Sequence, residues 1–166
     1  MANVKTKIET NADIEYDDFL SLNKRELKKA IKAGIRKGMS LLRTAGRASL
    51  RAAMGKAATH QNPKYNDTLQ QGVRNTRVIE KGGEQYGYVT ITSNRKTGSG
   101  SYRLIFFEGG TVERRTKRGY NRGSIAAKFF FAEANDSTAG QIQDAIDKGI
   151  TDAVNKINSS KNDRDI

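Results

Sequence analysis

The chain has 166 residues, enough for one domain with a single core, and its 30 Lys and Arg against 18 Asp and Glu give a formal net charge of +12. It has no Cys and one His, which excludes disulfides, thiolate metal sites, Cys nucleophiles and mechanisms that need a pair of His residues. The mean hydropathy is −0.72, and no apolar run approaches the roughly 18 residues of a membrane span. No secretory signal is expected either, because the N-terminus carries no apolar segment.

The positive charge is concentrated in the middle of the chain. Residues 1–20 hold five acids against two bases and residues 133–166 hold seven acids against four bases, so each end carries −3. Residues 21–132 hold 24 bases and six acids, or +18. A basic body between acidic ends indicates either a nucleic-acid face or charge-complementary contact between copies. Solubility combined with pairing inside the chain explains the same pattern equally well.

Residues 1–22 lack a sustained period and are predicted to form an acidic arm. Asn23 and Glu26 have the spacing of a capping box, and the apolar residues that follow recur at helical steps. We therefore expect an amphipathic helix over about residues 24–57. Its opposite face is basic, with Lys29, Lys32, Arg36, Arg43, Arg47 and Arg51. Gly34, Gly38 and Gly46 interrupt this helix, and the sequence leaves open whether they serve close packing or a bend.

The middle of the chain changes to an alternating period. Residues 73–80 and 85–92 are predicted to be strands joined by a turn at 81–84, where the two glycines tolerate positive φ. A third strand is predicted at residues 102–108, whose apolar residues on both faces are typical of a central strand. Long polar loops are predicted at 93–101 and 112–124, and the second of these is strongly basic.

The C-terminal part predicts another helix. Residues 125–134 are apolar, and Thr138 with Gln141 has capping-box spacing before an apolar stripe that ends at Ile157. Residues 159–166 are predicted to be a flexible tail. The fold class is therefore α+β, with a long N-terminal helix and a C-terminal helix packed on a small antiparallel sheet of three to four strands. Residues 23–158 are expected to form a single domain.

The sequence offers little catalytic chemistry. His60 lies in a polar loop with no Ser or Asp partner pattern, and Glu108 and Glu113 only flank a double glycine. No phosphate-binding glycine motif precedes a helix. We therefore expect no enzyme activity, no cofactor and no metal. The basic side chains are instead candidate contacts for a partner or for DNA: Arg43, Arg47 and Arg51 in the helix, and Arg114, Arg115, Lys117, Arg118 and Arg122 in the second loop.

A resemblance appears at the third predicted strand and after it. The segment 102–111 (YRLIFFEGGT) resembles the strand end of the head–tail joining, or tail-completion, proteins of the neck of tailed phages. In that family a variable loop follows, then an Ala- and Phe-containing apolar segment, then an amphipathic helix. Residues 112–124, 127–134 (AKFFFAEA) and the helix to Ile157 match this order, and residues 66–73 resemble the lead into the family's first strand. The motif residues are Phe106, Phe107, Glu108, Gly109, Gly110, Thr111, Phe129, Phe130 and Ala134.

The resemblance implies a structural virion protein of the head–tail connector. Such proteins form rings, here of roughly six or twelve copies, between portal, adaptor or head-completion proteins and the tail. It also implies non-specific contact with DNA that passes through the lumen, a place in the virion neck and host cytoplasm before assembly, and no membrane. Lys128 stands where the family usually has Pro. The alternative prediction is a basic nucleic-acid-binding module.

Overall fold

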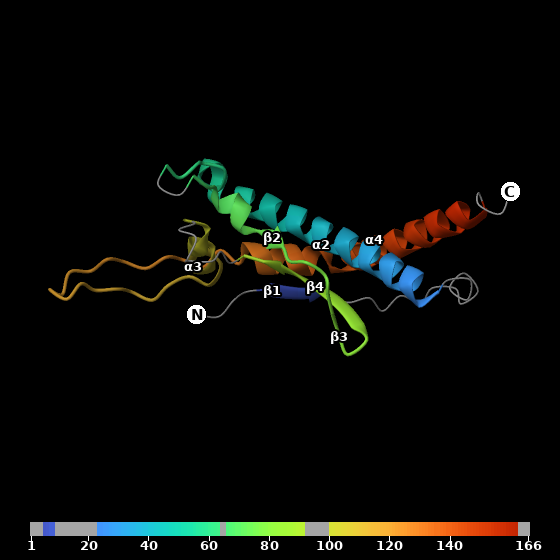
Figure 1. The fold of residues 1–166 in the computed structure, drawn as a ribbon. Helices are drawn as coiled ribbons and strands as arrows, with labels where there is room; N and C mark the ends of the chain where they lie inside the picture. Colours follow the sequence, from blue (N-terminus) through green and yellow to red (C-terminus); the bar gives the residue numbers. More distant parts are fainter. Residues whose placement is uncertain (1–4, 9–22, 64–65, 92–99, 163–166) are drawn as a thin grey trace. The chain divides into compact units, whose positions relative to one another are not determined.

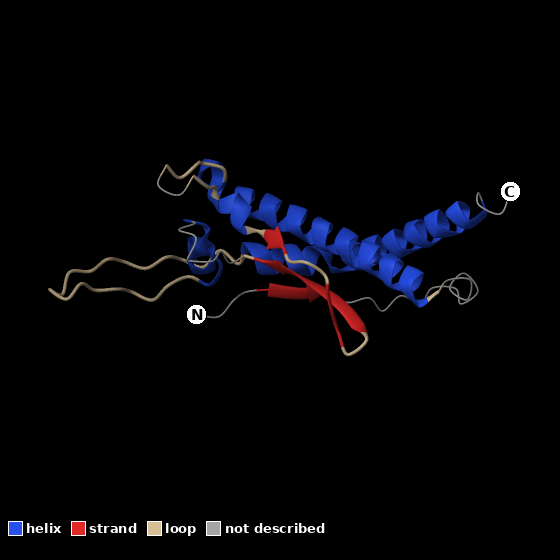
Figure 2. Cartoon of the chain, viewed as in Figure 1, coloured by secondary structure: helices blue, strands red, loops and turns tan. Residues whose placement is uncertain are grey.

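The protein is described from a computed structural model that places residues 5–8, 23–63, 66–91 and 100–162 (Figures 1 and 2). Its contacts group into two compact units. The first unit holds Met1–Thr6, Arg43–Arg74 and Val89–Ser137, and the second holds Lys7–Leu42, Asn75–Tyr88 and Thr138–Ile166. The elements are β1 (Lys5–Ile8), α2 (Lys24–Met54), β2 (Arg74–Asn75), β3 (Ile79–Lys81), β4 (Glu84–Thr90), α3 (Leu104–Gly109) and α4 (Phe130–Asn162), with 3-10 turns at Gly55–Ala58, Leu69–Gly72 and Gly100–Arg103. The α+β fold class is confirmed.

Helix α2 begins at the predicted capping box. The Asn23 side chain accepts a hydrogen bond from the Glu26 N–H at 3.0 Å, and the Glu26 carboxylate accepts one from the Asn23 N–H at 3.0 Å. The helix ends at Met54, and a 3-10 turn continues it to Ala58. Ile35, Met39 and Leu42 of the predicted apolar stripe are fully buried. The sequence therefore predicted both the start of this helix and its buried face.

In the second unit α2 and α4 approach each other at glycines. A Cβ on Gly34 would lie 2.6 Å from the carbonyl oxygen of Ile146, and one on Gly149 would lie 2.9 Å from the Cα of Gly34. A Cβ on Gly38 would lie 2.7 Å from Ile146. The small residues let the two backbones come closer than larger side chains would allow. Close packing is therefore the role of Gly34 and Gly38, a question that the sequence left open.

The sheet is small, with strand order β1–β4–β2 and with β3 paired to β4. β3 and β4 form the predicted antiparallel hairpin, in which Ile79 pairs with Tyr86 and Lys81 with Glu84. Gly82 and Gly83 both have positive φ, as a two-residue turn of this kind requires. The predicted strand 73–80 is shorter than expected, because only Arg74–Asn75 and Ile79–Lys81 are extended and paired.

Residues 102–108 are helical, so the predicted third strand is wrong. A 3-10 turn at Gly100–Arg103 leads into α3, in which Leu104 and Glu108 are buried. The rings of Tyr102 and Phe106 pack edge to face, with their centroids 6.3 Å apart. Side chains four residues apart on a helix make this kind of contact. A short apolar run has no period that separates a buried strand from a buried helix, which explains the error.

Helix α4 begins eight residues before the predicted cap. It starts at Phe130, so Thr138 and Gln141 lie inside the helix and their spacing was misleading. The helix also continues to Asn162, so residues 159–162 of the predicted tail are helical, while residues 163–166 lie outside the described residues. Ile142, Ile146, Ile150 and Val154 are buried, which confirms the predicted apolar stripe. Among the described helices, none has a stretch long and apolar enough to span a bilayer.

Three other predictions concern segments between these elements. Lys5–Ile8 forms strand β1, so this part of the predicted arm is paired in the sheet, while residues 9–22 lie outside the described residues. Most of the predicted loop 93–101 also lies outside them. Residues 112–124 were predicted to be a long polar loop, and they form a hairpin-shaped loop with one isolated antiparallel bridge between Arg115 and Asn121, which runs out from α3 and the first turns of α4 (Figure 1, gold to orange).

Candidate functional site

Glu108 joins the two segments that carry the sequence resemblance. The residue is 6% exposed, and its two carboxylate oxygens accept hydrogen bonds from the backbone N–H groups of Phe131 and Ala132, each at 2.9 Å. These N–H groups belong to the first turn of α4 and have no partner inside the helix. A carboxylate at a helix N-terminus also interacts favourably with the helix dipole. Glu108 therefore caps α4 from α3, across 23 and 24 residues of sequence.

Backbone contacts reinforce this junction. The N–H groups of Lys128 and Phe129 donate to the carbonyl oxygens of Phe107 and Glu108, at 2.7 and 3.2 Å. Gly110 has φ +71, and a Cβ there would lie 2.9 Å from both the Ala127 nitrogen and the Ile125 oxygen. Only glycine meets both demands, which explains the second glycine of the motif. The two ends of the 112–124 hairpin are therefore clamped together at its base.

The Phe residues around the start of α4 divide into a buried and an exposed set. Phe130 and Phe131 are buried, and Ala134 is nearly so. The ring of Phe131 lies against Gly46 of α2, where a Cβ would be 3.1 Å from the ring. Phe129 is different, since it has φ +45 and is 55% exposed. A left-handed conformation at a bulky residue costs on the order of 1 kcal/mol, so the junction imposes it.

We call residues 112–124 the basic hairpin. Its ladder includes hydrogen bonds from Thr111 N–H to Ile125 O at 2.9 Å, from Arg122 N–H to Arg114 O at 2.7 Å, and from Thr116 N–H to Tyr120 O at 2.9 Å. Gly119 closes the turn with φ +83. Every residue of the hairpin except Thr116 is exposed. The hairpin thus has its own backbone order and presents nearly all its side chains to solvent.

The charges of the basic hairpin are poorly compensated within it. Arg114, Arg115, Lys117, Arg118 and Arg122 face one acid, Glu113, whose oxygen lies 3.7 Å from Arg115. That exposed pair contributes little. Arg114 and Arg122 lie opposite each other in the ladder, where like charges are unfavourable. An anionic partner would relieve this repulsion, which makes the hairpin a candidate site for a carboxylate-rich or phosphate-rich surface.

The three candidate arginines of α2 have different environments. Arg51 is exposed and Arg43 is partly buried. Arg47 donates from Nε to the Val73 carbonyl oxygen at 3.1 Å. Burial lowers the pKa of Arg47, and the neighbouring charge of Arg43 lowers it further, although arginine stays protonated in proteins. Arg47 therefore has a structural role that its place on the basic face did not indicate.

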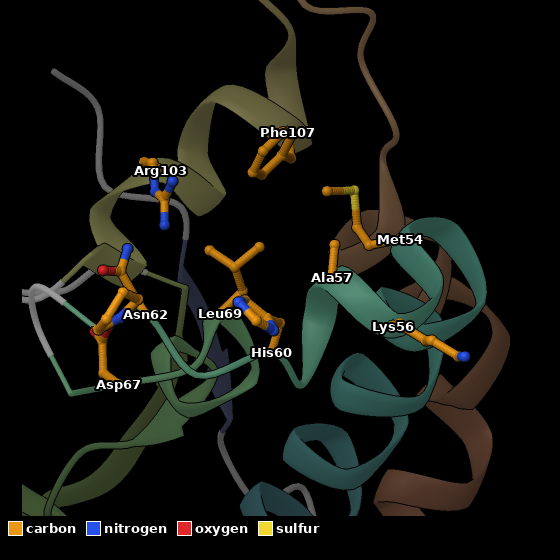
Figure 3. Close-up of a pocket in the computed structure, with 10 residues that line it drawn as sticks. Met54, Lys56, Ala57, His60, Asn62, Asp67, Leu69, Arg103 and Phe107 are labelled. Atoms are coloured by element: carbon orange, nitrogen blue, oxygen red, sulfur yellow. The ribbon is translucent and has the colours of Figure 1, made fainter.

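A cavity of about 510 Å³ lies beside α3 in the first unit. Figure 3 shows Phe107 and Met54 directed toward each other above Leu69, with Arg103 and Asn62 on one side. His60, which the sequence placed in an exposed loop, contributes to the wall and is exposed. No sequence pattern indicated this cavity, because its lining comes from three separate stretches of the chain, residues 54–63, 67–69 and 103–107. Among the described residues, no group of three or more His, Cys, Asp or Glu could hold a metal ion.

Comparisons with protein-family models, with curated proteins and with solved structures found no match for this chain.

Proposed function

We propose that this chain is a structural virion protein of a tailed phage, which forms a ring in the head–tail connector and joins portal or head-completion proteins to the tail. The observation that carries the proposal is the cap of Glu108 on α4. The two sequence segments that resemble the neck-protein motif, around Glu108 and around Phe130, are joined by direct hydrogen bonds. The junction brings the two segments together, although the first is helical here and not the strand end that the resemblance implied.

The junction also projects the basic hairpin, which has the composition of an interaction surface. Val112, Tyr120 and Phe129 are 83%, 70% and 55% exposed, at the base and near the tip of a segment rich in arginine. Arginine and aromatic residues are enriched in protein interfaces. In the proposed ring the hairpin reaches a neighbouring protein layer or the DNA that passes through the lumen. The partners are other copies of the chain, portal, adaptor or head-completion proteins, and tail proteins.

The location follows from the same proposal. The protein resides in the virion neck and, before assembly, in the host cytoplasm. The acidic ends of the chain, each at −3, and its basic middle at +18 give every copy two complementary charge types. Complementary charge steers association and fixes register more than it adds affinity. Assembly of the ring is therefore expected to slow as ionic strength rises.

A nucleic-acid-binding module is the second candidate, and the basic hairpin favours it. Five exposed cations on one projecting loop can neutralise phosphates, and a two-stranded β-ribbon is an element that the major groove of duplex DNA admits. The module explains the charge of the hairpin but gives no role to the junction at Glu108.

Sedimentation velocity across salt concentration, with and without duplex DNA, separates the two functions. A closed oligomer of one stoichiometry with weak affinity for DNA supports the connector protein. A monomer that binds DNA with a steep salt dependence supports the module and contradicts the connector. Electron microscopy of the same samples shows whether an oligomer is a ring.

A further inference from the structure

A second basic surface lies in the second unit, between α2 and the β3–β4 hairpin. It is a groove of about 230 Å³. Four cations of α2 line it at helical steps of three, one and three residues: Arg25, Lys28, Lys29 and Lys32. Because these steps place the side chains on one stripe of the helix, the cations follow each other over about 10 Å. We call this surface the cationic groove.

The opposite wall of the cationic groove is the β3 side. Glu80 pairs with Lys28, and Ile79 is 40% exposed. Arg25, Lys29 and Lys32 form no ion pair with a described carboxylate. The groove therefore holds four cations against one acid, beside an exposed apolar side chain. The remaining lining residues on this wall are Val78 and Gln85.

The sequence contains a segment that complements this groove. Residues 9–18 (ETNADIEYDD) hold five acids and no base, and they lie outside the described residues, so only their sequence is used. Acids and apolar residues alternate at its centre, with Asp13, Glu15 and Asp17 around Ile14 and Tyr16. The charge of this segment is therefore opposite to that of the groove.

We infer that the cationic groove binds the acidic segment 9–18 of a second copy of this chain. Charge attraction between the acids of this segment and Arg25, Lys29 and Lys32 is the main contribution to binding. Nucleic acid complements this groove less well, because a phosphate makes no favourable contact with the exposed Ile79 side chain. The inference rests on the proposed ring and deepens it: one groove and one segment per copy make a head-to-tail contact that cyclic symmetry closes.

Charge reversal in full-length protein tests the contact. One variant reverses the groove (Arg25→Glu, Lys29→Glu and Lys32→Glu), and another reverses the segment (Asp13→Lys, Glu15→Lys and Asp17→Lys). In each variant alone, the Kd of self-association should rise by at least roughly tenfold. An equimolar mixture should associate again, because each variant then offers the charge that the other lacks. A control with three exposed bases reversed elsewhere (Arg36→Glu, Lys148→Glu and Lys156→Glu) should associate like the wild type, and circular dichroism shows that each variant is folded.

The possible outcomes are distinct. Association of the groove variant at wild-type strength overturns the inference. The inference is also overturned if the mixture fails to associate while a chain that carries both reversals associates again. That result places the segment in the groove of its own chain.

A labelled peptide of residues 9–18, titrated into the segment-reversed protein, separates this inference from the proposed ring. Binding that the groove reversal abolishes supports the groove even if the wild type never forms a ring, in which case only the connector function fails. A peptide that does not bind overturns the groove and leaves the connector function standing. Duplex DNA that binds in place of the peptide, and is lost on groove reversal, assigns the groove to phosphates.

Discussion

The carboxylate of Glu108 accepts a hydrogen bond at 2.9 Å from the backbone N–H of Phe131, the second residue of helix α4. A side chain at the end of one helix thereby fixes the start of another, and the basic hairpin is the chain between them. This arrangement has a consequence for stability and a consequence for function. The cap holds the base of the hairpin, while the hairpin itself contributes almost nothing to the core.

Replacement of Glu108 by Ala should lower the free energy of unfolding by about 1–3 kcal/mol, because two backbone N–H groups at the start of α4 lose their acceptors. Glu108→Gln keeps one acceptor oxygen and should cost less. Urea unfolding monitored by circular dichroism measures both changes. Glu113→Ala, at an exposed position five residues away, is the control and should stay within about 0.5 kcal/mol of the wild type. Equal stability of the Glu108→Ala variant and this control would refute the capping role.

Two glycine-to-alanine substitutions in long helices should change the free energy of unfolding in opposite directions. Gly34→Ala places a Cβ 2.6 Å from the Ile146 carbonyl oxygen and should destabilise by about 1–3 kcal/mol. Gly140→Ala has nothing within 4 Å and should stabilise by up to about 1 kcal/mol, since alanine is the better helix former. Thermal unfolding of the two variants gives the comparison. A stabilising Gly34→Ala change would show that α2 and α4 do not approach each other at this glycine.

The adjacent glycines of the motif also offer a matched pair. Gly110→Ala should destabilise by about 1–3 kcal/mol, because φ is +71 and the Cβ would meet the Ala127 backbone at 2.9 Å. At Gly109 a Cβ meets nothing within 4 Å, and Gly109→Ala should be close to neutral. Denaturant midpoints measure both. Similar costs at the two positions would contradict the clamp at the base of the hairpin.

Removal of charge from the basic hairpin should separate function from folding. We consider a variant with four substitutions: Arg114→Ser, Arg115→Ser, Lys117→Ser and Arg118→Ser. Its free energy of unfolding should stay within about 0.5 kcal/mol of the wild-type value, since these side chains are exposed. Its affinity for duplex DNA should fall. The slope of the logarithm of the binding constant against the logarithm of salt concentration should become less steep, by the equivalent of up to about four phosphate contacts. Fluorescence anisotropy against salt gives both values. An assembly defect with unchanged DNA affinity would assign the hairpin to protein contacts instead.

The parts of the fold that follow from local rules were predictable. The capping box at Asn23, the apolar stripe of α2 and the turn at Gly82 depend on residues close in sequence, and all three are confirmed. The start of α4 was not predictable in this way. Its cap is Glu108, 23 residues away from Phe131, whereas Thr138 offered a local capping pattern that the helix does not use.

The sequence predicted which residues make up the candidate site but not their backbone structure. The basic residues 112–124 were identified, but their hairpin depends on backbone pairing and on Gly119 and Gly123 at positive φ. The structural role of Arg47 depends on the Val73 carbonyl group, 26 residues away. For the cationic groove a partial signal existed, since Arg25, Lys28, Lys29 and Lys32 fall on one helical stripe. The other wall of that groove comes from β3, which no helical period reveals.

Native mass spectrometry of the wild-type protein, over a range of concentration and ionic strength, tests the central claim that this chain assembles into a ring. The proposed function predicts one closed stoichiometry, of roughly six or twelve copies, that weakens as salt rises. A protein that stays monomeric under all conditions, and binds duplex DNA with a steep salt dependence, would contradict it.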